Sequence, residues 1–326
     1  MNENNVALRV KDLHVHYDTE DGVVKAVSGV SFDLHANERM GLVGESGCGK
    51  STMALGLMRL IKEPGEVVAG EAWLGDKNLF ALSYEEMRMA RGLEIGMIPQ
   101  GAMNSLVPVI RVKNQIIDAL ADHKLGLSKE QLEERALEAL DSVELPRKVA
   151  EMYPHELSGG MKQRVCAAIS LAMRPKVIIA DEPTSALDVI TQRQVMETIG
   201  RLQERTNSAV ILIGHDMGLQ AQFVNRVAVM YAGKLVEVGT VKEIFTDALH
   251  PYTQLLISSL PTLGSKGVFV SIPGIAPSLL ELPSGCVFHP RCPKAMAICN
   301  QEEPVLHSDS SGRRVSCHLY GNGGMN

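Results

Sequence analysis

The chain has 326 residues, of which 45% are hydrophobic, and a formal net charge of −6. This length suits one large domain or two modest ones with a substantial apolar core. The basic residues are dispersed, which excludes the charge pattern of a nucleic-acid-binding surface. The apolar runs are far shorter than the about 20 residues that cross a bilayer, and no signal-peptide pattern opens the chain. We therefore expect a cytosolic protein that reaches a membrane only through partners.

Short strands are predicted before residue 44. Apolar segments at 6–10 and 23–34 are broken by clusters of Asp, Glu and Gly, a pattern typical of antiparallel strands and turns. A further apolar run at 40–43 predicts a strand that leads into a glycine-rich segment. The sequence thus predicts an N-terminal antiparallel β region.

Residues 44–52 fit the phosphate-binding pattern Gly-x4-Gly-Lys-Ser/Thr, and a helical run at 53–60 follows them. Glycines let successive backbone N–H groups point at phosphate oxygens, while Lys50 reaches the terminal phosphates and Ser51 offers a hydroxyl to Mg²⁺. The helix adds the positive end of its dipole. A nucleoside triphosphate is therefore the expected ligand. Its predicted contacts in this loop are Gly44, Glu45, Ser46, Gly47, Cys48, Gly49, Lys50, Ser51 and Thr52.

Helical sequence fills the region from 101 to about 160. Residues 128–131 form a capping box, and Leu132, Ala136 and Leu140 recur on one helical face. The region is expected to be a helical subdomain inserted into an α/β domain.

Apolar runs typical of buried strands lie on both sides of this insertion, separated by helical patterns. They occupy residues 95–98, 177–180, 210–213 and 227–231, and 233–238 is expected to add a last strand. Such alternation predicts a parallel or mixed sheet with helices on its faces, and hence an α/β fold.

Two carboxylates, Asp181 and Glu182, end the strand predicted at 177–180. The carboxyl edge of a sheet can present one such group to a metal and the other to a water. We predict that Asp181 holds Mg²⁺, directly or through water, and that Glu182 polarises the attacking water. The alternative is a solvated acidic turn after a buried strand.

Residues 157–164, Leu-Ser-Gly-Gly-Met-Lys-Gln-Arg, resemble the signature motif of ATP-binding cassette (ABC) proteins. This turn opens a helix, so Ser158 and the amides of Gly159 and Gly160 can bind a terminal phosphate. In this family that nucleotide is held by the other subunit. The resemblance therefore implies a phosphate-loop NTPase core of RecA-like type and a head-to-tail dimer around two ATP molecules.

The resemblance extends to four positions outside these motifs. Gln100 is similar to the family's Q-loop glutamine, Asp188 to the last residue of its D-loop, His215 to its switch histidine and Tyr17 to the aromatic residue that stacks on adenine. The implied catalytic residues are then Glu182, His215, Lys50 and Gln100. Mg²⁺ would be held by Ser51, Gln100 and Asp181.

Four of the six cysteines lie between residues 286 and 317. In a cytosolic chain their spacing points to ligation and not to disulfides. Four thiolates can hold a four-iron four-sulfur cluster or one structural zinc, although the close Cys-x-x-Cys pairs usual in zinc ribbons are absent. Buried thiols that only pack are the other interpretation. The candidate ligands are Cys286, Cys292, Cys299 and Cys317.

The Pro-rich sequence after residue 242 extends the resemblance. Segments 250–256 and 285–293 resemble the C-terminal region of ATP-binding subunits of dipeptide, oligopeptide and nickel importers. This implies a nucleotide-binding domain at 1–242 and a loop-rich C-terminal extension at 243–326. Some members of that subfamily carry an iron–sulfur cluster on the four cysteines, so the resemblance favours a [4Fe–4S] cluster over zinc.

The implied function is that of an ATP-hydrolysing subunit of a binding-protein-dependent importer, at the cytoplasmic face of the membrane. The implied partners are a second cassette, expected to be a homologous chain, two transmembrane permease subunits and an extracytoplasmic substrate-binding protein. Peptides are the expected cargo, with oligosaccharides and nickel as alternatives. A soluble cassette ATPase of DNA repair or translation is the competing class, but the chain has neither a long coiled-coil insertion nor tandem cassettes.

Overall fold

The computed structural model describes residues 5–101, 105–185, 187–260 and 272–320. The chain forms two compact units, each built from several stretches of sequence. The first comprises Met1–Leu8, Leu34–Arg39 and Leu74–Leu212, and the second comprises Arg9–Asp33, Met40–Trp73 and Ile213–Asn326.

The second unit contains the predicted N-terminal β region. Strands β2 (Gly22–His35), β1 (Val6–Thr19) and β4 (Gly65–Leu74) follow one another in the sheet in that order, and β1 runs antiparallel to β4. Alternate side chains of β1, among them Leu13 and Val15, are fully buried, as expected for a strand with one face on the core. The predicted antiparallel strands are confirmed.

A second sheet in this unit leads to the glycine-rich loop. β3 (Arg39–Val43) runs parallel to β9 (Arg226–Tyr231), and β10 (Lys234–Thr240) pairs antiparallel with β9. Helix α7 (Met217–Phe223) precedes β9 in the chain. The strands predicted at 40–43, 227–231 and 233–238 are therefore confirmed within about two residues at each end.

The C-terminal extension contributes more regular structure than its Pro-rich sequence predicts. Its helices are α8 (Val241–Thr246), α9 (Pro251–Ser258) and the short 3₁₀ turns η5 (His289–Arg291), η6 (Ala297–Asn300) and η7 (His318–Tyr320). Two-residue strands β11 (His307–Ser308) and β12 (Arg314–Val315) add to the sheet, with β12 antiparallel to β10. The predicted boundary after residue 242 stays a prediction.

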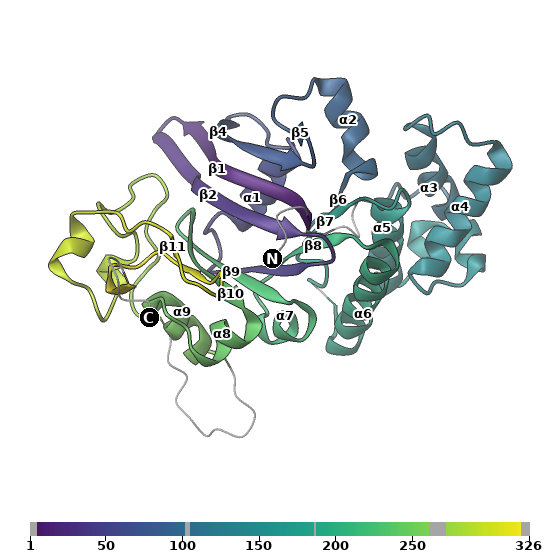
Figure 1. The fold of residues 1–326 in the computed structure, drawn as a ribbon. Coiled ribbons are helices and arrows are strands. Elements are labelled where there is room, and N and C mark those ends of the chain that lie inside the picture. Colours follow the sequence, from purple (N-terminus) through teal and green to yellow (C-terminus); the bar gives the residue numbers. More distant parts are fainter. Residues whose placement is uncertain (1–4, 102–104, 186, 261–271, 321–326) are drawn as a thin grey trace. The chain divides into compact units, whose positions relative to one another are not determined.

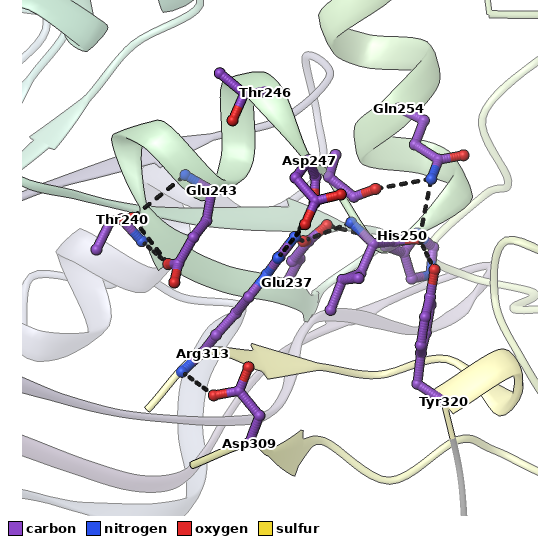
Figure 2. Close-up of polar contacts among 12 residues, drawn as sticks. Glu237, Thr240, Glu243, Thr246, Asp247, His250, Gln254, Asp309, Arg313 and Tyr320 are labelled. Carbon is purple, nitrogen blue, oxygen red and sulfur yellow. Dashed lines mark hydrogen bonds and ion pairs between the residues drawn. The ribbon is translucent and has the colours of Figure 1, made fainter. Parts of the chain in front are cut away.

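A buried ion pair fastens the extension to β10. The carboxylate of Glu237 is fully buried and accepts hydrogen bonds from Arg313 Nη2 at 2.8 Å and from the backbone N–H groups of Leu249 and His250, each at 2.9 Å. Figure 2 shows Arg313 reaching across the sheet to Glu237 and Asp247. Both oxygens of this buried carboxylate therefore accept hydrogen bonds, three in all, the condition under which such a charge is tolerated.

The first unit holds strands β8 (Ala209–Ile213), β7 (Val177–Asp181) and β6 (Ile95–Ile98), adjacent in that order, and β6 runs parallel to β7. Every residue of β7 and β8 is buried, as their continuous apolar sequence predicts for strands covered on both faces. Helices α2 (Tyr84–Leu93), α5 (Gly159–Leu171) and α6 (Val189–Thr206) belong to the same unit, as does the short strand β5 (Lys77–Asn78).

Helices occupy the region predicted to be a helical subdomain, over its described residues, and its status as a subdomain stays a prediction. Helices α3 (Val112–Ala121) and α4 (Lys129–Ser142) pack side by side (Figure 1) and are followed by the turns η3 (Arg147–Glu151) and η4 (Pro154–Glu156). Ser128 caps α4 in the predicted capping box with Gln131. No helix within the described ranges is long and apolar enough to cross a membrane.

Candidate nucleotide-binding site

The loop at 44–49 joins β3 to helix α1 (Lys50–Leu57), which begins and ends three residues before the helical run predicted at 53–60. Gly49 is the residue before the helix and has φ of 104°, a conformation that L side chains rarely adopt. A Cβ atom at this position would also collide with the carbonyl oxygen of Ala26. Gly44 meets the same limit, because a Cβ there would strike the carbonyl oxygen of Met230. Backbone conformation and close packing together explain why the loop needs glycine at these two positions.

Lys50 lies folded over the loop and is only 7% exposed. Its ammonium group donates hydrogen bonds to the carbonyl oxygens of Gly44 at 2.8 Å and Glu45 at 2.9 Å. The loop thus holds a positive charge beside the N-terminus of α1, where the helix dipole favours an anion, and this is the chemistry that phosphate groups require. Burial raises the pKa of the neighbouring Cys48 thiol, although Lys50 opposes the shift, so Cys48 stays neutral and packs.

A cavity of about 390 Å³ borders this loop within the second unit. It is lined by loop residues Glu45, Ser46, Gly47 and Cys48, by Tyr231 at the end of β9 and Ala232 after it, and by Ala276, Pro277 and Leu279 of the extension. Ser46 and Gly47 are exposed at its edge.

Tyr17 and His215, the predicted adenine-stacking and switch residues, belong to the same unit as the loop. Tyr17 lies on β1 opposite Gly65 of β4, and its half-buried ring covers that glycine. His215 is exposed between β8 and α7, next to Asp216, whose side chain caps α7. Their roles toward a nucleotide stay predictions.

Gln100 and Glu182 are brought together in the first unit. Ile98 of β6 pairs with Ala180 of β7, so the residues that follow these two strands leave the sheet at one edge. There Gln100 Nε2 donates a 2.8 Å hydrogen bond to Glu182 Oε2. Glu182 has φ of 45°, in the left-handed region that is uncommon for a residue other than glycine and is found at functional turns.

Asp181 is the last residue of β7 and is 3% exposed. Together with the hydroxyl of Ser51 and the amide of Gln100 it offers the hard oxygen donors that Mg²⁺ prefers, so these residues fit the ion in their chemistry. No group of three or more His, Cys, Asp or Glu side chains that could hold a metal occurs among the described residues.

The signature segment and the D-loop residue are both helix caps. Ser158 begins α5 and its hydroxyl accepts the backbone N–H of Met161 at 3.3 Å. Asp188 begins α6 and accepts N–H groups of Ile190 and Thr191 as well as the Thr191 hydroxyl, which lowers its pKa. A Cβ on Gly160 would strike the Thr191 side chain, so the two helix starts pack closely. Ser158 and Gly159 remain exposed.

The four cysteines of the extension are free thiols. Backbone amides donate to their sulfurs, from Lys294 to Cys292 and from Met296 to Cys299, both at 3.4 Å. Burial raises the pKa of the Cys286 and Cys292 thiols and brings the pKa of Cys317 to about 11. As arranged in the structure, however, these sulfurs do not form a metal-binding group within the described chain. The predicted cluster on these cysteines is therefore not supported by the side-chain geometry.

Three residues around the loop were not predicted from the sequence. Arg291 forms a bidentate ion pair with Glu45, Tyr252 accepts the Glu45 N–H, and Tyr231 lies against both. Arg291 and Tyr252 lie within the two C-terminal segments that carried the family resemblance. Nothing in their spacing indicates a contact with a loop more than 200 positions away.

Two family models match the chain. Residues 27–185 match the model described as ABC transporter, and residues 236–299 match that of the oligopeptide/dipeptide transporter C-terminal region. The second match begins in β10 and covers three of the four C-terminal cysteines.

Curated relatives resemble the chain over nearly its whole length. It is 45% identical over 316 residues to the oligopeptide transport ATP-binding protein OppD of Salmonella typhimurium, covering 96% of this chain and 93% of the relative. It is 47% identical over 300 residues to the dipeptide transport ATP-binding protein DppD of Lactococcus lactis, covering 91% and 86%.

Among solved structures, a dimeric ATP-binding cassette in a post-hydrolysis state with bound ADP and phosphate superposes with a TM-score of 0.64 at 28% identity. The match covers 72% of this chain and 98% of that one. The predicted phosphate-loop NTPase fold of the cassette type is thereby confirmed.

Proposed function

Since this chain belongs to the ABC transporter family, among the ATP-binding subunits of oligopeptide and dipeptide transporters, we propose that it hydrolyses ATP to drive the import of peptides. The observation that carries this proposal is the hydrogen bond from Gln100 to Glu182 at the edge of the β6–β7 pair. It supports the proposed role of Glu182, because it fixes the carboxylate that we propose activates the hydrolytic water.

In the proposed reaction a water oxygen forms a bond to the terminal phosphorus while the bond from that phosphorus to the bridging oxygen of ADP breaks. Glu182 accepts a hydrogen bond from the water and polarises it, and His215 helps to orient it. The hydrogen bond from Gln100 fixes the orientation of the Glu182 carboxylate. Lys50 and the loop amides stabilise the negative charge that develops on the phosphoryl oxygens.

Ser51, Gln100 and Asp181 are the residues that would hold Mg²⁺. The ion supplies further positive charge to the phosphate oxygens when it is bound with ATP. Each of the three residues offers a neutral or anionic oxygen atom, the type of ligand that Mg²⁺ prefers.

A second cassette would complete the site. Ser158 and Gly159 are exposed at the N-terminus of α5, a helix of 13 residues whose dipole favours an anion at this end. These groups suit the terminal phosphate of a nucleotide carried by another subunit. The similar solved cassette is a dimer. We expect the partner to be a homologous chain.

We further propose that the assembly includes two transmembrane permease subunits and an extracytoplasmic substrate-binding protein, with this chain peripheral at the cytoplasmic face. Closure of the cassette dimer on ATP would then switch the permeases between inward- and outward-facing states. The names of the relatives support peptides as cargo. Oligosaccharides and nickel are the alternatives.

The four C-terminal cysteines are proposed to hold a [4Fe–4S] cluster, with zinc as the alternative. Their close spacing in the sequence supports this, as do backbone N–H donors to two of the sulfurs, because such donors accompany cluster ligation. The sulfurs would have to move together on ligation, since as arranged within the described chain they form no metal-binding group. Anaerobically purified protein should then contain about four iron and four sulfide per chain and absorb near about 400 nm. Protein without iron but with one zinc would favour zinc, and protein free of both metals would refute the proposal.

The function is tested by ATP hydrolysis in the complex reconstituted with its cassette partner, permeases and binding protein. The binding protein would be loaded in turn with a peptide, an oligosaccharide or nickel. We expect the peptide-loaded form to stimulate hydrolysis. Stimulation by one of the other cargoes would correct the substrate, and hydrolysis indifferent to all three would contradict the transport role.

A further inference from the structure

We propose that Arg291 and Tyr252 of the C-terminal extension are positioning residues for the nucleotide site, which act by holding Glu45 of the phosphate loop. This rests on the proposed role of the loop in binding ATP. The consequence is that the extension, and not the cassette core alone, sets the affinity of the site for nucleotide. All of the residues involved lie within the second unit.

The first contact is a bidentate ion pair between Arg291 and Glu45. Arg291 Nη1 lies 2.7 Å from Glu45 Oε2, and Nη2 lies 3.0 Å from Oε1. The side chain of Arg291 is only 6% exposed and that of Glu45 27% exposed. A bidentate, largely water-excluded guanidinium–carboxylate pair fixes both the position and the plane of the carboxylate, which an exposed ion pair does not.

Arg291 is itself held in place from three directions. Its Nε donates to the carbonyl oxygen of Pro273 at 2.7 Å, and Nη1 also donates to the Tyr231 hydroxyl at 3.2 Å. The guanidinium carbon lies 5.8 Å from the centre of the Tyr231 ring. The pairing with Glu45 raises the pKa of Arg291 further above its already high value, so the charge is permanent. The guanidinium group of Arg291 is therefore held in the orientation in which it pairs with Glu45.

The second contact reaches the backbone of the same loop residue. The N–H of Glu45 donates to the Tyr252 hydroxyl at 2.9 Å. Tyr252 is fully buried and packs against Tyr231 and Phe288 with ring centres 4.6 and 5.3 Å away. Burial raises the pKa of its hydroxyl, which thus remains a neutral acceptor. The extension therefore holds Glu45 at both its main chain and its carboxylate.

Glu45 in turn is connected to the phosphate-binding lysine. The carbonyl oxygen of Glu45 accepts a hydrogen bond from Lys50 Nζ, and so does that of Gly44 just before it. If Arg291 is removed, the part-buried carboxylate loses its partner and must turn toward water to regain hydration. Such a movement would shift the loop amides and the acceptors of Lys50 together. Small misplacements of this kind weaken binding without removing any ligand-contacting group.

The matched control is the other ion pair that fastens the extension to the sheet. Arg313 is as buried as Arg291, and its partner Glu237 is fully buried. Figure 2 shows that the Arg313 network involves β10, α8, the start of α9 and the end of the extension. None of the contacts described for Arg313 involves the phosphate loop. Loss of Arg313 should therefore destabilise the extension without acting on Glu45.

The experiment compares Arg291→Gln, Tyr252→Phe, Glu45→Gln and Arg313→Gln in the purified full chain. The affinity for a fluorescent ATP analogue with Mg²⁺ and the melting temperature are measured for each. We expect Arg291→Gln to weaken nucleotide binding about tenfold and Tyr252→Phe to weaken it in the same direction. Arg313→Gln should lower the melting temperature and leave the affinity within about twofold of the parent.

A double variant shows whether Arg291 acts through Glu45. If it does, Arg291→Gln combined with Glu45→Gln should bind nucleotide about as well as Glu45→Gln alone, because the two residues form one unit. Parental affinity in Arg291→Gln would overturn the inference, as would equal weakening in Arg313→Gln or purely additive losses in the double variant. A parent chain that binds no ATP would instead overturn the proposed function together with this inference.

Discussion

The amide of Gln100 donates a 2.8 Å hydrogen bond to the carboxylate of Glu182. The two residues follow neighbouring parallel strands, β6 and β7, whose register is fixed by the pairing of Ile98 with Ala180. A strand pair buried in the core therefore sets the separation of two groups that the proposed mechanism uses on the same nucleotide. The sheet gives the site its precision, since loops alone would leave these side chains free to diverge.

Replacement of Glu182 by Gln should retain ATP binding and slow hydrolysis by at least about 100-fold. Glutamine keeps the size of the side chain but cannot polarise the water as a carboxylate does. Single-turnover hydrolysis and nucleotide affinity are measured on the assembled complex. Glu94→Gln is the control, because Glu94 of the same unit pairs with Lys77 and Lys176 and has no proposed catalytic role. Parental hydrolysis in Glu182→Gln would show that another group activates the water.

Replacement of Gly49 by Ala should abolish nucleotide binding and destabilise the fold. The added Cβ would require φ of 104° and collide with the carbonyl oxygen of Ala26, so the loop must open. Gly75→Ala is the matched control. Gly75 has φ of 57° with no atom within 4 Å of the added Cβ, so only the left-handed backbone cost of about 1 kcal/mol applies. Nucleotide binding and thermal unfolding report both effects. Normal ATP affinity in Gly49→Ala would contradict the assigned loop.

Two helix-capping serines separate stability from catalysis. Ser158 caps α5 and Ser128 caps α4, so replacement of either by Ala should cost about 1 kcal/mol of stability. Only Ser158→Ala should also reduce ATP hydrolysis by the assembled complex, because Ser158 is proposed to contact the nucleotide of the partner cassette. The unfolding free energy and the hydrolysis rate are measured for both variants. Equal hydrolysis rates in the two variants would remove Ser158 from the proposed site.

His250 should make the stability of the chain depend on pH below neutrality. It is buried at the start of α9, where its Nδ1 accepts the Tyr252 N–H, and burial lowers its pKa from 6.5 to about 3. Between these values the unfolded chain binds a proton that the folded chain does not. Stability therefore falls as the pH drops from 6.5 toward 3.

The size of this effect is about 1.4 kcal/mol per pH unit at most, or about 2 kcal/mol between pH 6.5 and pH 5. His250→Asn keeps a capping acceptor but does not titrate. Its unfolding free energy, measured with urea at pH 7 and pH 5, should fall by less than that of the parent. The same decrease in parent and variant would show that His250 does not remain neutral in the folded chain.

Local patterns predicted much of the fold because they act over a few residues. The glycines of the loop, the capping boxes and the apolar runs of β7 and β8 each specify their own conformation. The family resemblance assigned Gln100 and Glu182 to one site, but their hydrogen bond was not predicted, because the two residues are 82 positions apart.

The contacts of the extension could not be predicted in this way. Arg291 and Glu45 are 246 positions apart, and an ion pair leaves no periodic trace in sequence. Strands β11 and β12 have two residues each, too few to show alternation. For the four cysteines the sequence shows the type of ligand but not the arrangement. Their spacing indicates ligand chemistry, but it does not set the distances between their sulfurs.

The central claim is that ATP hydrolysis at this site drives peptide import. It is tested most directly by uptake of a labelled peptide into lipid vesicles that contain the complete complex, with ATP on the side of the cassettes and loaded binding protein on the other. We expect uptake that requires ATP and is lost when Glu182 is replaced by Gln. Uptake that persists in the Glu182→Gln complex, or a parent complex that hydrolyses ATP without moving peptide, would contradict it.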